Sequence, residues 1–495
     1  MKYSKQFLIA VIFFSILSSC NFGKEKKDDL KTVFENINKD VLENSEAFAE
    51  LEKVCDQIGH RLTGTENGKK AEQLSFDLFT KYGYTPEFFE FTTKCWQRET
   101  VEIHFYQNGE EIPVDAVSLA LTPISADVTA EMVDVGNGLR EDFDRIGKES
   151  IAGKIILVNL GIHPEDSTKA NLHRSEKTAL AIEYGASGCI FMNKVEGRVL
   201  LTGTASVTDE LVLIPAVCVT YEDGMMMRER MNALTGQKNL FTAQLKMTNT
   251  FDEVQSRNVI ATLEGIEKPD EWICIGGHLD SWDLAQGAID NGIGTFAIMD
   301  AARTLNALDL KPKRTIKFIM WMGEEQGLLG SKAMIANWKG NGNIDKVKTY
   351  INLDMAANPI GFNDFGRPEW KTMFDELGKM MNAIDTVYKN TNTSEAGLHS
   401  DHEIFMLEGI PVIEQNSKLD DACFDFYHSN GDEFKLVNKD HLVNSVRFTA
   451  MLLYAIANCE EIPVKTLDSN QTRDYLIEQK LKEALVLGQE WKWEM

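Results

Sequence analysis

The chain has 495 residues, which is too long for one ordinary compact domain, so we expect a large catalytic domain and at least one further module. Hydrophobic residues make up 43% and charged residues 26%, a balance typical of a globular enzyme and not of a disordered chain. The formal net charge of -25, with no basic cluster beyond residues 24–27, argues against nucleic acid as a partner, because binding its phosphates requires a positive surface.

The first 20 residues have the pattern of a lipoprotein signal peptide. Lys2 and Lys5 precede an apolar run, Phe7–Leu17, that is too short to span a bilayer. Two serines and then Cys20 follow, which resembles a bacterial lipobox whose cysteine would be lipidated; an ordinary signal peptide with a chance cysteine is the alternative. We therefore expect an exported protein held at a membrane by a lipid anchor only, on the periplasmic or outer-membrane face, with residues 21–29 as a tether.

The cysteines after the signal peptide do not form a recognisable framework. Their number is odd, they are widely scattered, and they include no CxxC pair, which argues against a disulfide scaffold and against a thiolate zinc site. We expect most of them to be buried apolar residues. They are Cys55, Cys95, Cys189, Cys218, Cys274, Cys423 and Cys459.

In the first half of the chain, the predicted secondary structure changes at about residue 120. Residues 30–82 have helical patterning broken by a turn-rich stretch at 59–65, and alternation near 101–106 predicts a strand. A separate stretch at 120–248 has short strands with glycine and proline between them and holds no catalytic cluster. Its clearest predicted elements are strands at 154–158 and 188–192 and a helix at 175–184.

After about residue 255 the pattern is that of an α/β domain, in which apolar strands alternate with amphipathic helices. Parallel sheets bind ligands in a crevice at the carboxyl ends of their strands. The residues that directly follow each strand are therefore the candidates for a site. The predicted strands are 272–276, 315–322, 349–353 and 411–414, and a helix is predicted at 292–308.

Acidic and histidine residues follow these strands in order. A single one would more often be a turn or capping residue, but seven in ordered spacing favour one site. All are ligand types that zinc accepts, and five ligands can serve two metals if one carboxylate bridges them, an arrangement used for hydrolysis. The residues are His278, Asp280, Asp290, Glu324, Glu325, Asp354 and His428.

Several segments around these residues resemble the signature blocks of the M28 zinc peptidase family, and the likeness runs over roughly residues 45 to 463. It implies an α/β fold with a mixed sheet flanked by helices, and an inserted, mostly-β protease-associated domain at 120–248. The peptidase domain would then consist of 30–119 and 249–463. The segments are GHRLTGTEN (59–67), GGHLDSWDLAQGAIDNGIG (276–294), WMGEEQGLLGS (321–331), INLDM (351–355) and FYHSNGD (426–432).

The resemblance also implies a cofactor and residue roles. It implies two zinc ions, with Glu324 as the general base. It makes Asp280 a residue that accepts a hydrogen bond from the far ring nitrogen of His278 and so orients that ring. The implied ligands are Asp290 as the bridge, His278 and Asp354 on one zinc ion, and Glu325 and His428 on the other.

The resemblance implies a homodimeric exopeptidase that cuts dipeptides or short peptides at a free terminus, as a dipeptidase or carboxypeptidase. Other family members are aminopeptidases, and the metal ligands do not distinguish the two. Asp401 is a candidate substrate contact, and Arg61 and Arg174 are candidates either for a substrate carboxylate or for structural salt bridges. A glutaminyl cyclase-like transferase and a non-catalytic receptor are disfavoured, because the ligand set is complete.

Residues 464–495 are extra relative to the family. Leu476, Leu481 and Leu485 have helical spacing, and Trp491 and Trp493 follow them. This pattern predicts a helical extension that docks either on the body of the protein or on a second subunit.

Overall fold

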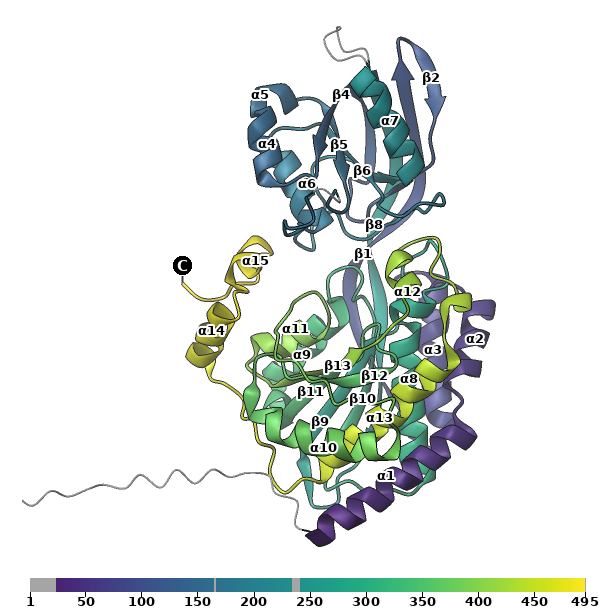
Figure 1. Ribbon diagram of the computed structural model, residues 1–495, viewed down its shortest axis with the longest axis vertical. Coiled ribbons are helices and arrows are strands. Elements are labelled where there is room, and N and C mark those ends of the chain that lie inside the picture. The colour runs from purple at the N-terminus through teal and green to yellow at the C-terminus, as the bar shows by residue number, and fades with distance from the viewer. Residues whose placement is uncertain (1–23, 164–165, 234–240, 495) are drawn as a thin grey trace, which may run out of the picture.

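The computed structural model describes residues 24–163, 166–233 and 241–494 and shows two lobes joined by a narrow waist (Figure 1). The lobes share one hydrogen-bonded sheet of 13 strands. Two long strands, β1 (Glu87–Gln107) and β8 (Phe241–Leu263), run through the waist and pair with each other along almost their whole length. The predicted fold, a mixed sheet flanked by helices with an inserted domain, is confirmed.

The larger lobe contains the parallel strands that the sequence predicts. Their order in the sheet is β12-β13-β11-β9-β10-β8, in which β13, β11, β9 and β10 run parallel and β12 and β8 run antiparallel to their neighbours. The central strands are rich in isoleucine and are buried on both faces, as expected for a covered parallel sheet. Their bounds are β9 (Lys268–His278), β10 (Arg314–Trp321), β11 (Val347–Asn352), β12 (Pro359–Asn363) and β13 (Val412–Ser417).

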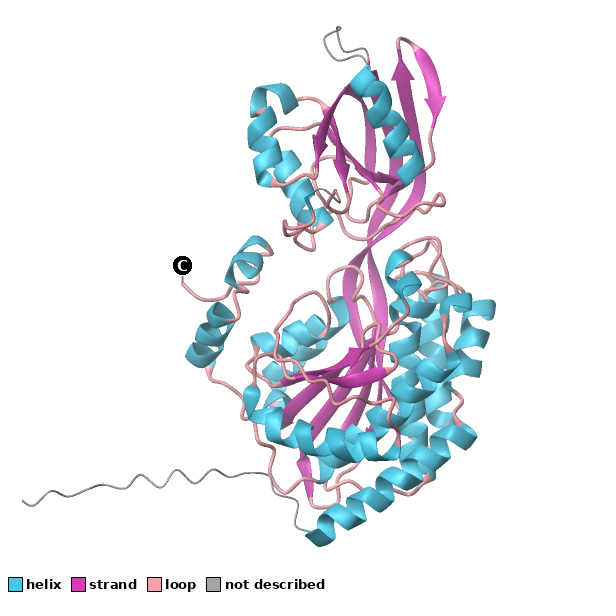
Figure 2. Cartoon of the chain, viewed as in Figure 1, coloured by secondary structure: helices cyan, strands magenta, loops and turns pink. Residues whose placement is uncertain are grey.

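Helices cover both faces of this sheet (Figure 2). One face packs into a large apolar core with six helices, and the other packs into a second core with two helices and the C-terminal extension. The first six are α1 (Lys24–Asn44), α2 (Ala47–Gln57), α3 (Glu66–Lys81), α8 (Ile293–Ala307), α10 (Lys371–Ile384) and α13 (Lys439–Asn458), and the other two are α9 (Leu329–Asn341) and α11 (His402–Leu407).

The smaller lobe continues the sheet beyond the waist. Strand β4 pairs antiparallel with the outer half of β8, and β5, β6 and β7 follow in parallel, with a separate apolar core on each face. The predicted elements at 154–158, 175–184 and 188–192 are confirmed as β5, α6 and β6. The elements are β2 (Glu110–Pro113), β3 (Ala116–Ser118), β4 (Ser125–Gly136), α4 (Arg140–Ile146), α5 (Lys148–Ile151), β5 (Ile155–Asn159), α6 (Arg174–Glu183), β6 (Gly188–Met192), β7 (Ala216–Val219) and α7 (Tyr221–Ala233).

A largely buried arginine at the waist connects the two lobes. The register between β1 and β8 shifts between Arg98 and Thr100, where the ribbon passes from one lobe to the other. The guanidinium of Arg98 donates to the carbonyl of Ser118 in the smaller lobe at 2.8 Å and to the carboxylate of Asp283 in the larger lobe at 3.1 Å. The side chain of Arg98 is only 10% exposed, so this ion pair is shielded from water and fixes the lobes at the base of the space between them.

The C-terminal extension folds as two helices, α14 (Ser469–Glu478) and α15 (Lys482–Leu487). Leu476 and Leu485 are 0% and 1% exposed and belong to the second core of the larger lobe. Of the two docking partners that the sequence leaves open, the structure shows the body of the same chain.

The seven cysteines from Cys55 to Cys459 are all buried, and among the described residues none of them forms a disulfide. Within the described ranges, no helix is both long enough and apolar enough to cross a bilayer. The segment predicted to be a signal peptide, with Cys20, lies outside the described residues.

Candidate metal centre

The fold brings the ends of three parallel strands to one edge of the sheet. His278 is the last residue of β9, Glu324 and Glu325 follow β10, and Asp354 follows β11. Asp290 lies just before α8, at the crossover from β9. His428 joins this edge from the loop between α12 (Asp421–Asp425) and α13. A sheet edge of this kind is where α/β proteins bind ligands.

The carboxylate of Asp290 lies between two imidazoles. Its Oδ1 is 3.1 Å from Nε2 of His278, and its Oδ2 is 3.0 Å from Nε2 of His428. The next carboxylate oxygen from each Nε2 belongs to a different residue: Oδ1 of Asp354 is 3.4 Å from His278, and Oε2 of Glu325 is 3.0 Å from His428. The five side chains therefore form two groups of three that share Asp290.

The spacing of these atoms fits zinc. Two zinc–ligand bonds of about 2.0–2.1 Å at a tetrahedral angle place their ligand atoms about 3.3 Å apart. The nitrogen–oxygen distances here run from 3.0 to 3.4 Å. Ligand atoms of His278, Asp290 and Glu325 all lie within 4.8 Å of one another, and the second oxygen of Glu325 is buried without a hydrogen-bond partner among the described residues. The residues present therefore fit a metal cation.

The same side chains concentrate negative charge in a buried place. Burial raises the pKa of Glu325 well above its ordinary value, and repulsion from Asp290 adds to the effect. Burial also raises the pKa of Glu324, and the charges of Asp354 and Glu325 raise it further. Burial opposes ionisation of Asp290 too, but hydrogen bonds from His278 and His428 lower its pKa. A bound cation would relieve the repulsion among these carboxylates.

Asp280 differs from its expected role. Nδ1 of His278 is 3.1 Å from the backbone carbonyl oxygen of Asp280 and 3.7 Å from its carboxylate, so the carbonyl orients the ring. The carboxylate instead accepts a hydrogen bond from the hydroxyl of Thr63 at 3.0 Å and one from the backbone N–H of Glu324 at 3.3 Å. Asp280 therefore has two contacts at the site: its carboxylate holds the backbone of Glu324, and its carbonyl oxygen contacts the ring of His278.

Asp432 and Asn291 were missed as site residues. The carboxylate of Asp432 accepts hydrogen bonds from the backbone N–H groups of Ile289 and Asp290, at 2.7 and 3.1 Å. Asn291, which follows Asp290 through a cis peptide bond, donates to the carbonyl of Leu353 at 2.7 Å. Both hold the backbone next to a candidate ligand. Asp432 lies in the FYHSNGD segment, which was the available signal.

The guanidinium of Arg61 binds backbone carbonyl groups and does not face the cavity. It donates to the carbonyl oxygens of Leu279, Gln286 and Gly287, each at 2.7 Å, and the side chain is fully buried. These bonds hold the loop from β9 to Asp290 in shape. Of the two roles that the sequence leaves open for Arg61, the structure therefore favours the structural one, because each guanidinium nitrogen donates to a backbone carbonyl and the side chain is fully buried.

Arg174 does face the site, from the smaller lobe. Its Nη2 is 3.2 Å from Nδ1 of His428, and its Nε is buried with no hydrogen-bond partner among the described residues. Gly203, at φ +113°, lies against this guanidinium, and a Cβ there would be 1.8 Å from Nη2. A glycine is therefore needed for Arg174 to reach His428.

Asp401 is not on the wall of the cavity. It directly precedes α11, its residue is 1% exposed, and it lines neither of the two large cavities next to the centre. Burial raises its pKa to about 7. The structure therefore does not place Asp401 where a substrate would touch it. His399, by contrast, lines both cavities and stacks on His173 of the smaller lobe, with ring centroids 5.7 Å apart.

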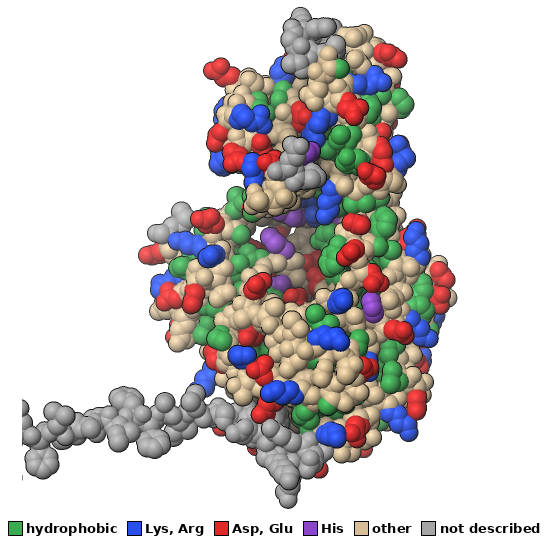
Figure 3. Space-filling model, in the orientation of Figure 1, with side chains coloured by type: hydrophobic (Ala, Val, Ile, Leu, Met, Phe, Trp, Pro, Cys, Tyr) green, Lys and Arg blue, Asp and Glu red, His purple; other side chains and the backbone are tan. Residues whose placement is uncertain are grey.

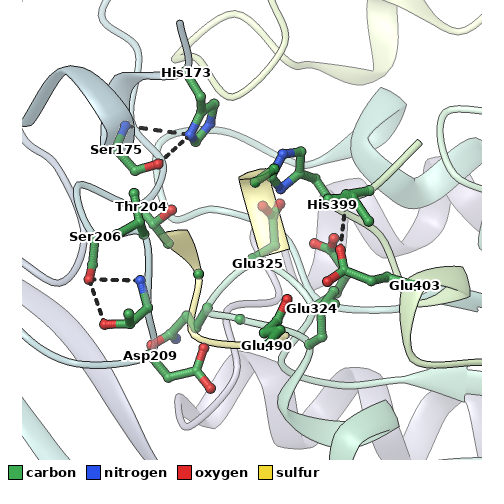
Figure 4. A pocket seen from close by; sticks show the side chains of 18 of the residues that line it. His173, Ser175, Thr204, Ser206, Asp209, Glu324, Glu325, His399, Glu403 and Glu490 are labelled. Atoms are coloured by element: carbon green, nitrogen blue, oxygen red, sulfur yellow. Dashed lines mark hydrogen bonds between the residues drawn. The ribbon is translucent and has the colours of Figure 1, made fainter. Parts of the chain in front are cut away.

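The centre opens into a cavity of about 700 Å³ between the lobes. Figure 3 shows the hollow, with histidine and acidic side chains visible inside it. Glu324, Glu325 and Asp354 form part of its wall, and a loop of the smaller lobe that includes Asp209 forms another part (Figure 4). A second cavity of about 600 Å³ adjoins it and shares Asp354. Both volumes lie in the range of small-molecule sites.

Comparison with known sequences agrees with this architecture. Residues 258–453 match Peptidase family M28, and residues 124–227 match the PA domain. The chain contains a peptidase family M28 domain and an inserted PA domain. The M28 domain indicates a hydrolase of the peptidase class.

Individual M28 relatives cover most of the chain. Mouse carboxypeptidase Q is 24% identical over 433 residues, which are 84% of this chain and 86% of that protein. The human carboxypeptidase Q is 26% identical over 435 residues with the same coverage. A probable leucine aminopeptidase 2 of Aspergillus oryzae is 24% identical over 407 residues, 75% of this chain and 77% of the relative. This chain is similar to both kinds of M28 peptidase.

Solved structures show the same fold. A peptidase M28 precursor from Shewanella amazonensis superposes with a TM-score of 0.75 at 22% identity, over 89% of this chain and 99% of the other. A zinc aminopeptidase from Bacillus subtilis superposes with a TM-score of 0.62 at 21% identity, over 86% and 98%. The two-lobed arrangement of the M28 domain and its insert is therefore shared.

Replacing Arg61 by methionine should destabilise the protein by about 3–5 kcal/mol, because three buried carbonyl groups lose their donor. Urea unfolding of the zinc-loaded protein measures this change. Arg140→Met is the matched control, since the ion pair of Arg140 with Glu183 is more than half exposed and should contribute less than about 1 kcal/mol. Equal losses in the two variants would contradict the role of Arg61 in holding the loop.

Proposed function

We propose that the protein is a dinuclear zinc exopeptidase that hydrolyses dipeptides or short peptides at a free terminus. The observation that carries this proposal is the position of Asp290, whose two oxygens face two different imidazoles at 3.1 and 3.0 Å. A carboxylate in this position can bridge two metal ions, and paired metals are a recognised arrangement for hydrolysis. Similarity to carboxypeptidase Q over 84% of the chain supports an exopeptidase.

In the proposed centre, Asp290 would contact both ions. His278 and Asp354 would hold one of them, and Glu325 and His428 would hold the other. The 3.4 Å and 3.0 Å contacts within these pairs support the division. The remaining acidic residue, Glu324, is farther away, with Oε2 4.0 Å from Nε2 of His278, and it lines the cavity. It is free to act on the substrate side.

Glu324 supplies the acid–base chemistry in this proposal. Zinc, when bound, supplies Lewis acidity that favours attack by water and polarises the scissile carbonyl. Glu324 takes the proton of the attacking water at its carboxylate and passes it to the departing amine. The hydrogen bond from its backbone N–H to Asp280 keeps it aimed at the cavity.

Arg174 supports recognition of a free carboxylate. Its guanidinium lines the cavity beside His428, and its Nε has no partner among the described residues. Arginine pairs with carboxylates through parallel hydrogen bonds, which suits the C-terminus of a peptide. An aminopeptidase is the second candidate, because Glu176, Asp209 and Glu403 line the same cavity and a carboxylate can hold a free amine. A cyclase or a non-catalytic receptor has less support, since the ligand set is complete.

From the sequence of the first 20 residues we also propose export and a lipid anchor on Cys20. A homodimer is proposed from the family resemblance only.

Replacing Glu324 by glutamine should lower hydrolysis at least about 100-fold while leaving the zinc content unchanged, because the general base is lost and no ligand is. A panel of free, N-blocked and C-blocked dipeptides measures the rate and shows which terminus the site reads. If Arg174 holds the carboxylate, N-blocked dipeptides are cut and C-blocked ones are not.

The matched control for this experiment is Glu210→Gln, which removes an exposed acid from the wall of the same cavity. It should retain the wild-type rate. Failure of the zinc-loaded wild type to cleave any peptide would rule out the peptidase chemistry assigned to this centre, and full activity of the Glu324 variant would rule out its role as base.

Zinc binding should weaken as the pH falls from 7.5 to 5. Burial lowers the pKa of His278, but the charges of Glu324 and Asp354 outweigh it and raise that pKa above the ordinary histidine range. Protons therefore compete for the metal-free site already near neutral pH, and lower pH favours release of zinc. Metal content after gel filtration at each pH measures the effect, with the melting temperature as a second readout. Zinc content that stays constant down to pH 5 would contradict this expectation.

A further inference from the structure

The C-terminal extension is fixed to the larger lobe by both apolar and polar contacts. Leu476 and Leu485 are buried in the second core of that lobe. The hydroxyl of Tyr475 donates to the carbonyl of Phe365 at 2.5 Å, and Nζ of Lys492 donates to the carbonyl of Leu407 at 2.7 Å. The segment between these anchors is therefore held in one place on the surface.

That segment forms part of the cavity that contains the proposed catalytic residues. Beyond the anchor at Leu485, the chain turns at Gly488 and runs along the cavity next to the smaller lobe. Figure 4 shows Glu490 at the same cavity as Glu324, Asp209 and Glu403. The residues of the extension that line the cavity are Ala484, Leu487, Gly488, Gln489 and Glu490.

Three separate parts of the chain meet at Lys332, on α9. Its Nζ is 3.0 Å from a carboxylate oxygen of Asp209, in the smaller lobe, and 3.0 Å from one of Glu490, in the extension. The side chains of these residues are 31%, 45% and 24% exposed, so the contacts are partly shielded. The extension is therefore joined to the rim of both lobes where they face each other.

Glu403 adds a contact from the larger lobe. Burial raises its pKa well above the ordinary value and the neighbouring Glu490 raises it further, so a protonated Glu403 can donate a hydrogen bond to Glu490. The backbone N–H of His399, another cavity residue, donates to Glu403 at 2.9 Å. The extension is thus linked to residues on the wall of the cavity.

We propose that residues 484–490 close one side of the active-site cavity and set the length of peptide that the enzyme accepts. The inference rests on the proposed exopeptidase function. A peptide longer than the enclosed space would have to displace this segment, with loss of its apolar packing and of the Glu490–Lys332 contact. Dipeptides fit without that cost. The extension is therefore a specificity-determining element, although none of its residues takes part in the chemistry.

The test compares two substrates. One is the dipeptide cleaved fastest in the panel of free, N-blocked and C-blocked dipeptides. The other is the same dipeptide extended by two residues at the terminus that the site does not recognise. Leu485→Asp places a charge in the apolar contact and should detach α15. Lys332→Ala removes the ionic contacts to both Asp209 and Glu490 without disturbing the core. Val486→Asp is the matched control, because it adds the same charge to an exposed position of α15 that does not line the cavity.

The measured quantity is the ratio of kcat/KM for the extended peptide to kcat/KM for the dipeptide. This ratio should rise at least about tenfold in Leu485→Asp and should also rise in Lys332→Ala. Leu485→Asp should still cleave the dipeptide. Val486→Asp should keep the wild-type ratio. An unchanged ratio in both zinc-loaded test variants would overturn the proposal. Failure of the wild type to cleave any peptide would instead overturn the proposed function, so the two failures are distinguishable.

Discussion

The carboxylate of Asp290, shared between the imidazoles of His278 and His428, is the contact on which the rest of the site depends. Asp290 lies among other buried acids, and such a concentration of charge is costly unless cations or protons offset it. The surrounding structure holds it in place. Asp432 binds the backbone of Asp290 itself, and Arg61 binds the loop that leads to it. These contacts fix the position of the Asp290 carboxylate before any substrate enters.

The elements around this contact follow from simple rules of chain geometry. Apolar strands buried on both faces run parallel, so the residues after them meet at one edge, and this allowed His278, Glu325 and Asp354 to be grouped from the sequence. The helix at 292–308 and the strands of the inserted domain were predictable for a second reason, which is the strong apolar periodicity of their sequences.

Other features depend on tertiary contacts that periodicity does not encode. The long β1–β8 ribbon was not predicted, because its burial changes from one lobe to the other and no single alternation runs along it. The Asp280 carbonyl, and not its carboxylate, orients His278, and this choice depends on backbone direction. The sequence does not distinguish the roles of Arg61 and Arg174. In the structure, Arg61 donates to backbone carbonyl groups, whereas Arg174 lines the cavity. The docking of the extension was likewise left open by its leucine spacing.

The two lobes and the extension enclose a site whose proposed chemistry depends on metal binding by Asp290. The most direct test is the zinc content of the purified protein after loading with excess zinc and gel filtration, beside the same measurement for Asp290→Asn. The account predicts two zinc ions per chain in the wild type and a loss of both, or of tight binding at both positions, in the variant, because one carboxylate serves both ions. A wild type that binds a single ion, or a variant that keeps two, would contradict it.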